Sequence, residues 1–145
     1  MKHNFLIIAG QFNELVSKSL VDSAIRELTL AGADDSQIET IWVPGSFEMP
    51  LTAKKAAMTR KYDAIICLGA VIKGETPHFD YVSGQAASGI MNASLESGVP
   101  IIFGVLTTNT IEQAMNRAGL KYGNKGADAA NTALKMINIL AKFEL

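Results

Sequence analysis

Three short segments of the chain place aromatic, polar and titratable side chains directly after apolar runs with strand character. The first segment contains Phe12, the second contains Ser46 and Glu48, and the third runs from Lys73 to Phe79 and includes His78. Ligands of parallel α/β sheets bind beyond the carboxyl ends of the strands, so we expect the three segments to open on one edge of a sheet. Together they would offer an aromatic platform, a carboxylate for ligand hydroxyls and a histidine that can move protons.

Each of these side chains also has a purely structural interpretation. Phe12 could pack beside the start of the following helix as a hydrophobic staple, and Glu48 in a first helical turn could simply complement the helix dipole. His78 differs from both, because a protonated imidazole is disfavoured at the positive end of a helix dipole. A structural role is uncommon at that position, which favours a functional role for His78.

A second group of residues suits an anionic ligand. The backbone N–H groups of Gly74 to Pro77, at an expected helix start, form an arrangement that binds phosphate or another oxyanion. Arg117, Lys121 and Lys125 place three cations within nine residues. They could cap the carbonyls of the preceding helix, or they could compensate the charge of a phosphorylated substrate.

Established catalytic and nucleotide-binding motifs do not occur in the sequence. It contains no G-x-G-x-x-G, P-loop, G-x-S-x-G or H-E-x-x-H pattern. Dinucleotide binding, NTP hydrolysis, serine hydrolysis and zinc peptidase chemistry therefore have little support.

The elements that must position these residues alternate between β-rich runs and longer segments of helical period, which is typical of a parallel sheet with crossover helices. Strands are expected at Phe5–Ala9, Ile38–Val43, Ala64–Ile72 and Ile101–Leu106. Helices are expected from an N-cap at Asn13 to about Ala31, from Ser46 to Arg60, from Thr76 and Pro77 to about Ser97, from a cap at Thr110 to about Arg117, and from Ala127 to Ala141. The pattern predicts an α/β, flavodoxin-like three-layer sandwich, with a four-stranded parallel sheet of order 2-1-3-4 and helices on both faces.

Composition and charge limit the remaining possibilities. A chain of 145 residues with 48% hydrophobic and 19% charged residues is expected to form one globular domain, residues 1–145. A net charge of −1 lacks the cationic excess of a general nucleic-acid binder, so no nucleic-acid partner is expected. One cysteine and two distant histidines predict neither a disulfide nor a metal site.

The apolar segments predict a cytoplasmic location without membrane association. The first apolar run, Phe5–Ala9, is short for the core of a signal peptide. The longest uncharged stretch is interrupted by Pro100 and Gly104, so it is not expected to span a bilayer.

Several longer motifs follow one another along nearly the whole chain. They are the segments Val43–Glu48, Gly69–Val82, Phe103–Thr108, Ile111–Gly119 and Gly123–Gly126. In these segments and in their order, the chain resembles the 6,7-dimethyl-8-ribityllumazine synthase family. Members of this family condense 5-amino-6-(D-ribitylamino)uracil with 3,4-dihydroxy-2-butanone 4-phosphate in riboflavin biosynthesis, with loss of phosphate and water. The resemblance implies an enzyme with two small-molecule substrates and no cofactor or metal.

The resemblance also implies roles for individual residues. Phe12 would stack on the pyrimidine ring, and His78 would transfer protons. The pyrimidine and its ribityl chain would be bound by Phe12, Ser46, Glu48, Val71, Ile72, Lys73, Phe103 and Lys125. The phosphate would be held by Gly74, Glu75, Thr76 and Arg117. Phe103, Arg117 and Lys125 would come from an adjacent subunit, so the active sites would lie at subunit interfaces.

The same resemblance implies a homo-oligomer. Family members form pentamers, and some close these into sixty-subunit capsids that could enclose riboflavin synthase. The helix expected from Thr76 and Pro77 to about Ser97 has a face of small side chains that suits contact between subunits. The connection from Gly119 to Gly126 has no insertion of the kind associated with free pentamers, which favours a capsid. The chain departs from the family pattern at Gln11, where an arginine is usual, and in its short segment before the first strand.

Two other functions fit the same fold. An archaeal-type riboflavin synthase would use two lumazines and need no phosphate site, which the segment Gly74–His78 and Arg117 argue against. A non-catalytic lumazine- or flavin-binding shell protein would keep the aromatic platform and the subunit contacts. Release of phosphate from the two substrates would distinguish the enzyme from such a binder.

Overall fold

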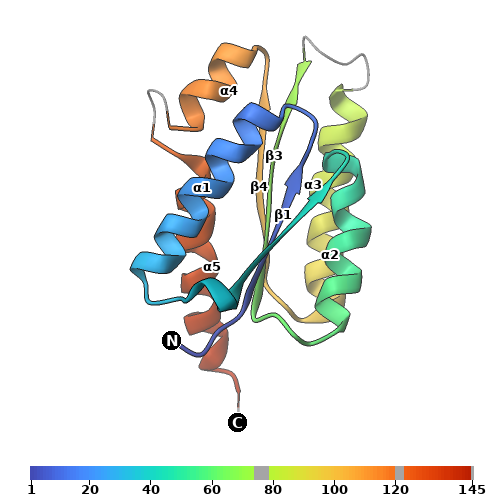
Figure 1. Cartoon of the computed structure of the whole chain (residues 1–145). Helices are drawn as coiled ribbons and strands as arrows, with labels where there is room; N and C mark the ends of the chain where they lie inside the picture. Colours follow the sequence, from blue (N-terminus) through green and yellow to red (C-terminus); the bar gives the residue numbers. More distant parts are fainter. Residues whose placement is uncertain (74–78, 120–122, 145) are drawn as a thin grey trace.

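A four-stranded parallel sheet lies at the centre of the computed structural model, which describes residues 1–73, 79–119 and 123–144 (Figure 1). The strands are β1 (Phe5–Gly10), β2 (Ile38–Val43), β3 (Ala64–Ile72) and β4 (Ile101–Thr108). Their order is β2-β1-β3-β4, and each neighbouring pair is parallel. The predicted α/β class and strand order are therefore confirmed.

Helices cover both faces of the sheet, as predicted (Figure 1). One face is covered by α1 (Glu14–Leu30) and α5 (Lys125–Ala141), and the other by α2 (Met49–Met58) and α3 (Phe79–Ser97). The short helix α4 (Ile111–Arg117) follows β4, while two 3-10 helices, η1 (Asp35–Gln37) and η2 (Ser46–Glu48), precede β2 and α2. Within the described ranges, none of the helices has the length and apolar character needed to cross a membrane.

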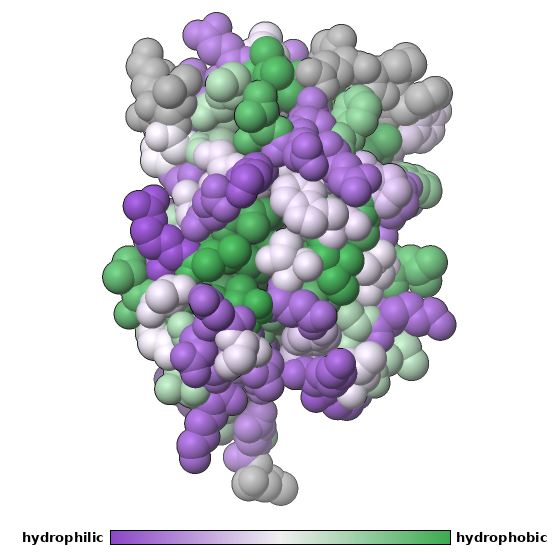
Figure 2. All heavy atoms as spheres, in the orientation of Figure 1, coloured by the Kyte–Doolittle hydropathy of each residue, from purple (hydrophilic) through white to green (hydrophobic). Residues whose placement is uncertain are grey.

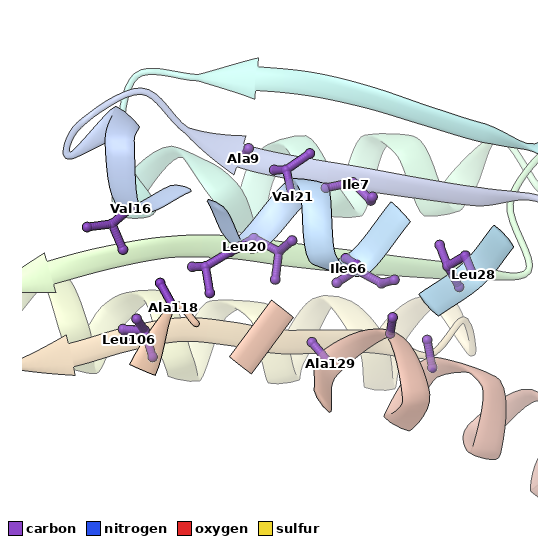
Figure 3. Close-up of a cluster of buried hydrophobic side chains, with 14 of the residues drawn as sticks. Ile7, Ala9, Val16, Leu20, Val21, Leu28, Ile66, Leu106, Ala118 and Ala129 are labelled. Carbon is purple, nitrogen blue, oxygen red and sulfur yellow. The ribbon is translucent and has the colours of Figure 1, made fainter. Parts of the chain in front are cut away.

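The sheet separates two hydrophobic cores because successive side chains of a strand point to opposite faces. Ile7 and Ile66 pair in register and lie in the core under α1 and α5, together with Leu20 (Figure 3). The next pair along the ladder, Ile8 and Cys67, lies in the core under α2 and α3. β1 and β3 are buried along their whole lengths, as expected for strands covered on both faces.

The two edge strands of the sheet are β2 and β4. Positions along most of β2 alternate between half-buried and exposed. In the orientation of Figure 1, hydrophobic residues in the middle of the visible face are bordered by hydrophilic ones (Figure 2). At the opposite edge, Phe103 of β4 is 40% exposed, so both edges present apolar groups at the surface.

β1 and β4 extend further than predicted. β1 continues to Gly10, and β4 continues past Leu106 to Thr108. The additional residues of β4 pair with Val71 and Ile72 at the end of β3. The length of β4 therefore follows from the length of the strand beside it.

The segment after β2 forms two elements where one helix was expected. Ser46–Glu48 forms η2, and α2 begins only at Met49. Pro50 lies within the first turn of α2, where proline is tolerated because an N–H at that position has no helical partner to lose. The break between η2 and α2 places Ser46 and Glu48 in a turn at the end of the strand.

α1 and α5 approach each other closely at one glycine. Gly126 lies in the first turn of α5, and an ideal Cβ at this position would be 2.0 Å from the carbonyl oxygen of Leu20 in α1. Such a distance is far inside van der Waals contact, so only a residue without a side chain fits. The close approach fixes the start of α5, including Lys125, against α1.

Candidate functional site

A cavity of about 330 Å³ lies at the carboxyl ends of β1, β2 and β3. Phe12 comes from the loop after β1, Ser46 and Glu48 come from η2, and Val71 and Ile72 come from the end of β3. We call this cavity the Phe12 pocket. The lining is completed by Pro44, Gly45, Phe47, Ala70 and Val82. Mostly apolar walls with a few polar groups are typical of small-molecule sites. The first two of the three predicted segments meet here at the edge of the sheet, whereas residues 74–78 of the third segment lie outside the described residues.

Two backbone hydrogen bonds fix the loop that carries Phe12. The N–H of Gln11 donates to the carbonyl of Val43 over 2.8 Å, and the N–H of Phe12 donates to the carbonyl of Pro44 over 3.0 Å. The Phe12 side chain itself is 55% exposed. Its position therefore depends on the backbone rather than on packing in a core, and an exposed ring in the lining of a cavity can stack on a planar ligand.

Asn13 lies at the N-cap of α1, as predicted, but its side chain does not cap the helix. Its backbone adopts the left-handed conformation, with φ 62° and ψ 48°. The side-chain Nδ2 instead donates to the carbonyl oxygen of Ala70 in β3 over 3.1 Å. The expected capping bond is replaced by a contact between the loop after β1 and the end of β3.

The wall of the Phe12 pocket formed by η2 packs closely against a strand glycine. An ideal Cβ on Gly69 would lie 3.3 Å from the Oγ of Ser46 and 3.1 Å from the Cε of Met49. Ser46 and Met49 are both buried, so the missing side chain at Gly69 leaves the space that they occupy. Glu48 is exposed at the opening, where its carboxylate can accept hydrogen bonds from ligand hydroxyls.

A second cavity, of about 680 Å³, lies along the free edge of β4. It is lined by Phe103 of β4, Arg117 at the end of α4 and Lys125 at the start of α5, and we call it the β4 groove. The Lys125 ammonium lies 3.9 Å from the carboxylate of Asp128, and both groups are largely exposed. An aromatic ring beside two cations suits an anionic ligand.

Asn124 joins the two segments that carry the cations of the β4 groove. Its Nδ2 donates to the carbonyl of Ala118 over 2.7 Å, next to Arg117. Its Oδ1 caps α5 by accepting from the N–H of Gly126 over 2.7 Å, next to Lys125. One side chain therefore ties the end of α4 to the start of α5.

Cys67 is the cysteine of the chain, and it lies in the core under α2 and α3. Burial raises the pKa of its thiol to about 12, which keeps the sulfur protonated and a poor nucleophile. In the part of the chain that the structure describes, no cluster of three or more His, Cys, Asp or Glu side chains could hold a metal ion. The two cavities described above are suited to binding and orienting ligands.

Known proteins match the chain along nearly its whole length. A family model described as 6,7-dimethyl-8-ribityllumazine synthase matches residues 2–141. The chain belongs to this family. The 6,7-dimethyl-8-ribityllumazine synthase of Clostridium kluyveri is 52% identical over 140 residues, which cover 97% of this chain and 91% of the relative. The protein of the same name from Syntrophus aciditrophicus is 55% identical over 139 residues, which cover 96% and 90% of the two chains.

Part of the site expected for a lumazine synthase falls outside the described residues. This part comprises Gly74, Glu75, Thr76, Pro77 and His78, with Lys121 further along the chain. The predicted helix start at Thr76 and Pro77 belongs to the same segment. Lys73 is described, and it lies exposed directly after β3.

Three residues that support the Phe12 pocket and the β4 groove are not predicted as such by the sequence. Asn13 is predicted as a helix cap, and no role is predicted for Met49 or Asn124. A capping rule could have identified Asn124, because asparagine is a preferred N-cap and a helical pattern follows it. No local signal indicates that Asn13 bonds to a strand residue 57 positions away.

Proposed function

We propose that the chain condenses 5-amino-6-(D-ribitylamino)uracil with 3,4-dihydroxy-2-butanone 4-phosphate to form 6,7-dimethyl-8-ribityllumazine, with release of phosphate and water, as a step of riboflavin biosynthesis. The observation that carries this proposal is the match to the family across residues 2–141. The Phe12 pocket and the β4 groove support it, because they offer an aromatic platform with polar groups and a pair of cations.

The aminouracil would bind in the Phe12 pocket. The ring of Phe12 would stack on the pyrimidine, since aromatic faces attract planar heterocycles. Ser46 and Glu48 would hydrogen-bond to the pyrimidine and to the ribityl hydroxyls, and the backbone of Val71, Ile72 and Lys73 would complete this wall. The support is geometric: apart from Lys73, these residues line one cavity.

The phosphate ester would bind where cations and backbone N–H groups can reach it. Arg117 would supply a planar guanidinium that matches phosphate oxygens in pairs. Gly74, Glu75 and Thr76 would supply backbone donors, as the resemblance implies. Phe103 and Lys125 line the same groove as Arg117, and they would contact the aminouracil, as the resemblance implies.

The chemistry itself needs proton transfer rather than a protein nucleophile. The amine of the uracil attacks the ketone, water leaves as a Schiff base forms, phosphate is eliminated, and the ring closes with loss of a second water. His78 would carry protons during these steps. The remaining task of the protein is to hold two substrates together, which can lower a barrier by several kcal/mol.

A direct assay of the wild-type chain with both substrates tests this function. Lumazine formation is followed by absorbance and phosphate release by a coupled reaction, and the two should appear in equal amounts. A non-catalytic binder would release no phosphate, and an archaeal-type riboflavin synthase would consume lumazine instead of forming it.

The role of His78 has its own test. His78→Ala should slow turnover by at most about 10²- to 10⁴-fold, the usual contribution of general acid–base catalysis. Unchanged steady-state and single-turnover rates in this variant would remove His78 from the mechanism.

We also propose that a second copy of the chain completes each active site. The support is that the Phe12 pocket and the β4 groove are different cavities of one chain. The assembly would be a homo-oligomer, either a pentamer or a sixty-subunit capsid, and a capsid could enclose riboflavin synthase. The proposal includes a cytoplasmic location, which suits a phosphate ester because a charged group crosses a bilayer poorly.

Mixed assemblies test whether two copies share a site. Phe12→Ala impairs one half of the site and Arg117→Ala impairs the other half. When equal amounts of the two variants are refolded together, about a quarter of the shared sites should combine an intact Phe12 from one chain with an intact Arg117 from its neighbour. Chains that each hold a complete site would regain none. Light scattering of the wild-type protein distinguishes a pentamer from a sixty-subunit capsid.

A further inference from the structure

Asn13 has an unusual backbone conformation for its place in the fold. Two described non-glycine residues have positive φ, Asn13 and Arg60. Arg60 follows the end of α2, where a left-handed residue commonly closes a helix. Asn13 precedes a helix instead, at a position that is normally extended so that its side chain can cap the first turn. A residue held in a sparsely populated conformation indicates a constraint from elsewhere in the structure.

The constraint on Asn13 is a hydrogen bond to a carbonyl group of β3 that lies beyond the last residue pair of β1 and β3. The pairing of β1 with β3 ends at Ala9 and Leu68, whereas β3 continues to Ile72. Ala70 therefore lies past the point where β1 leaves the sheet, and it is buried. The Nδ2 of Asn13 donates to the carbonyl of Ala70 over 3.1 Å. A side-chain amide thus supplies the hydrogen bond that the departing strand no longer provides.

The bond from Asn13 to Ala70 also fixes the loop after β1. This bond is made towards β3, whereas the backbone bonds of the loop are made towards β2. The N–H groups of Gln11 and Phe12 bind the loop to the end of β2, and Asn13 binds it to β3. Phe12 lies between these attachments, and its exposed ring has little packing of its own. Ala70 is also part of the lining of the Phe12 pocket, so the bond joins the aromatic platform directly to the facing wall.

We infer that Asn13 is a positioning residue, whose side chain holds Phe12 at a fixed distance from the β3 wall and so sets the binding of the aminouracil. This inference rests on the proposed function. The left-handed backbone belongs to the arrangement, because it turns the amide of Asn13 away from the helix and towards β3.

Kinetics of two substitutions test the role of Asn13. Asn13→Gly keeps access to the left-handed backbone and removes the amide. Asn13→Asp also tolerates this backbone, but its carboxylate cannot donate to Ala70. Each should raise KM for the aminouracil by about fivefold to tenfold, as expected for the loss of one hydrogen bond. KM for the butanone phosphate should change less than about twofold, because the bond from Asn13 to Ala70 supports the wall of the Phe12 pocket and not Arg117.

A double-substitution cycle distinguishes positioning from general stability. If Asn13 acts through Phe12, then Asn13→Gly should have almost no further effect on KM in a Phe12→Ala background. Ser94→Ala is the control, because it removes side-chain bonds to the carbonyl of Val99 over 2.8 Å and to the N–H of Ile101 over 3.2 Å, at the opposite end of the sheet from the pocket. This control should lower the melting temperature and leave both KM values unchanged.

The outcomes separate the two proposals. Wild-type protein that forms no lumazine would overturn both the function and the role of Asn13. Active wild-type protein with unchanged KM in the Asn13 variants, or with the full Asn13→Gly effect persisting in Phe12→Ala, would overturn only the role of Asn13. Where Asn13→Gly folds poorly, Asn13→Asp provides the same readout.

Discussion

The Phe12 pocket and the β4 groove are built in different ways. The pocket forms where three neighbouring strands end, and hydrogen bonds from Gln11, Phe12 and Asn13 hold its walls. The groove lies on an edge strand, and its cations depend on where α4 ends and α5 begins. Sheet topology is therefore sufficient to place the pocket, whereas helix packing decides the position of the groove. A substitution that alters the Phe12 pocket should therefore leave the β4 groove unchanged, and the reverse should also hold.

The largest effect is expected where helix packing supports the β4 groove. Gly126→Ala would place a methyl group 2.0 Å from the Leu20 carbonyl, and backbone atoms there cannot move aside. The free energy of unfolding should fall by about 3 kcal/mol, the upper part of the range for overpacking. Urea denaturation measures this loss. Thr29→Ala, an exposed change in α1, is the control and should stay within about 0.5 kcal/mol; equal losses in both variants would contradict the packing argument.

A smaller effect is expected from removing one cation of the groove. Arg117→Ala should lower kcat/KM for the butanone phosphate by about a hundredfold, through loss of charge-assisted bonds to phosphate. Arg117→Lys keeps the charge without the paired geometry and should recover part of the activity. Steady-state kinetics with each substrate varied in turn provides the measurement. An equal rise in KM for the aminouracil in Arg117→Ala would contradict the assignment of this cation to the phosphate substrate.

Removal of the aromatic platform should act on the other substrate. Phe12→Ala should raise KM for the aminouracil by about tenfold, within the range measured for stacking of a base on an aromatic ring. Phe12→Trp retains a stacking surface and serves as the matched control. The butanone phosphate should bind both variants normally. A change confined to the phosphate substrate would show that the two regions are assigned the wrong way round.

The smallest effect is expected at a residue outside both regions. Partial burial and a hydrogen bond to Glu39 raise the pKa of Tyr62 from 10.0 to about 12. The folded chain therefore keeps this proton more tightly than the unfolded chain does. The associated stability is present below pH 10 and is lost as the pH rises from about 10 to about 12. Tyr62→Phe should flatten this part of the stability curve in urea denaturation at several pH values.

Kinetic measurements on Tyr62→Phe complete the comparison. Both KM values should match those of the wild-type chain, because Tyr62 lines neither the Phe12 pocket nor the β4 groove. A change in either value would mean that the regions respond to the fold as a whole and not separately.

The sequence predicts the pocket better than the details that shape it. Phe12, Ser46 and Glu48 follow consecutive strands, and the parallel topology is enough to bring them to one edge. The bond from Asn13 to β3 could not be predicted, because it depends on the point where β1 leaves the sheet. The role of Gly126 in the packing of α5 on α1 could not be predicted either, since it depends on the distance between two helices that are far apart in the sequence.

Met49, a buried and adaptable residue, packs against two strand glycines next to the wall of the Phe12 pocket. The Cε of Met49 would be 3.4 Å from a Cβ added at Gly10 and 3.1 Å from one added at Gly69. This atom is the free end of an unbranched thioether, which can rotate to make room. A methyl group at Gly10 would therefore press mainly on an atom that can move, whereas one at Gly69 would also press on the Oγ of Ser46, 3.3 Å away in the pocket wall. Gly10 is therefore the position where the packing behind the pocket can change without contact to Ser46, which makes it the natural starting point for redesigning what the pocket admits.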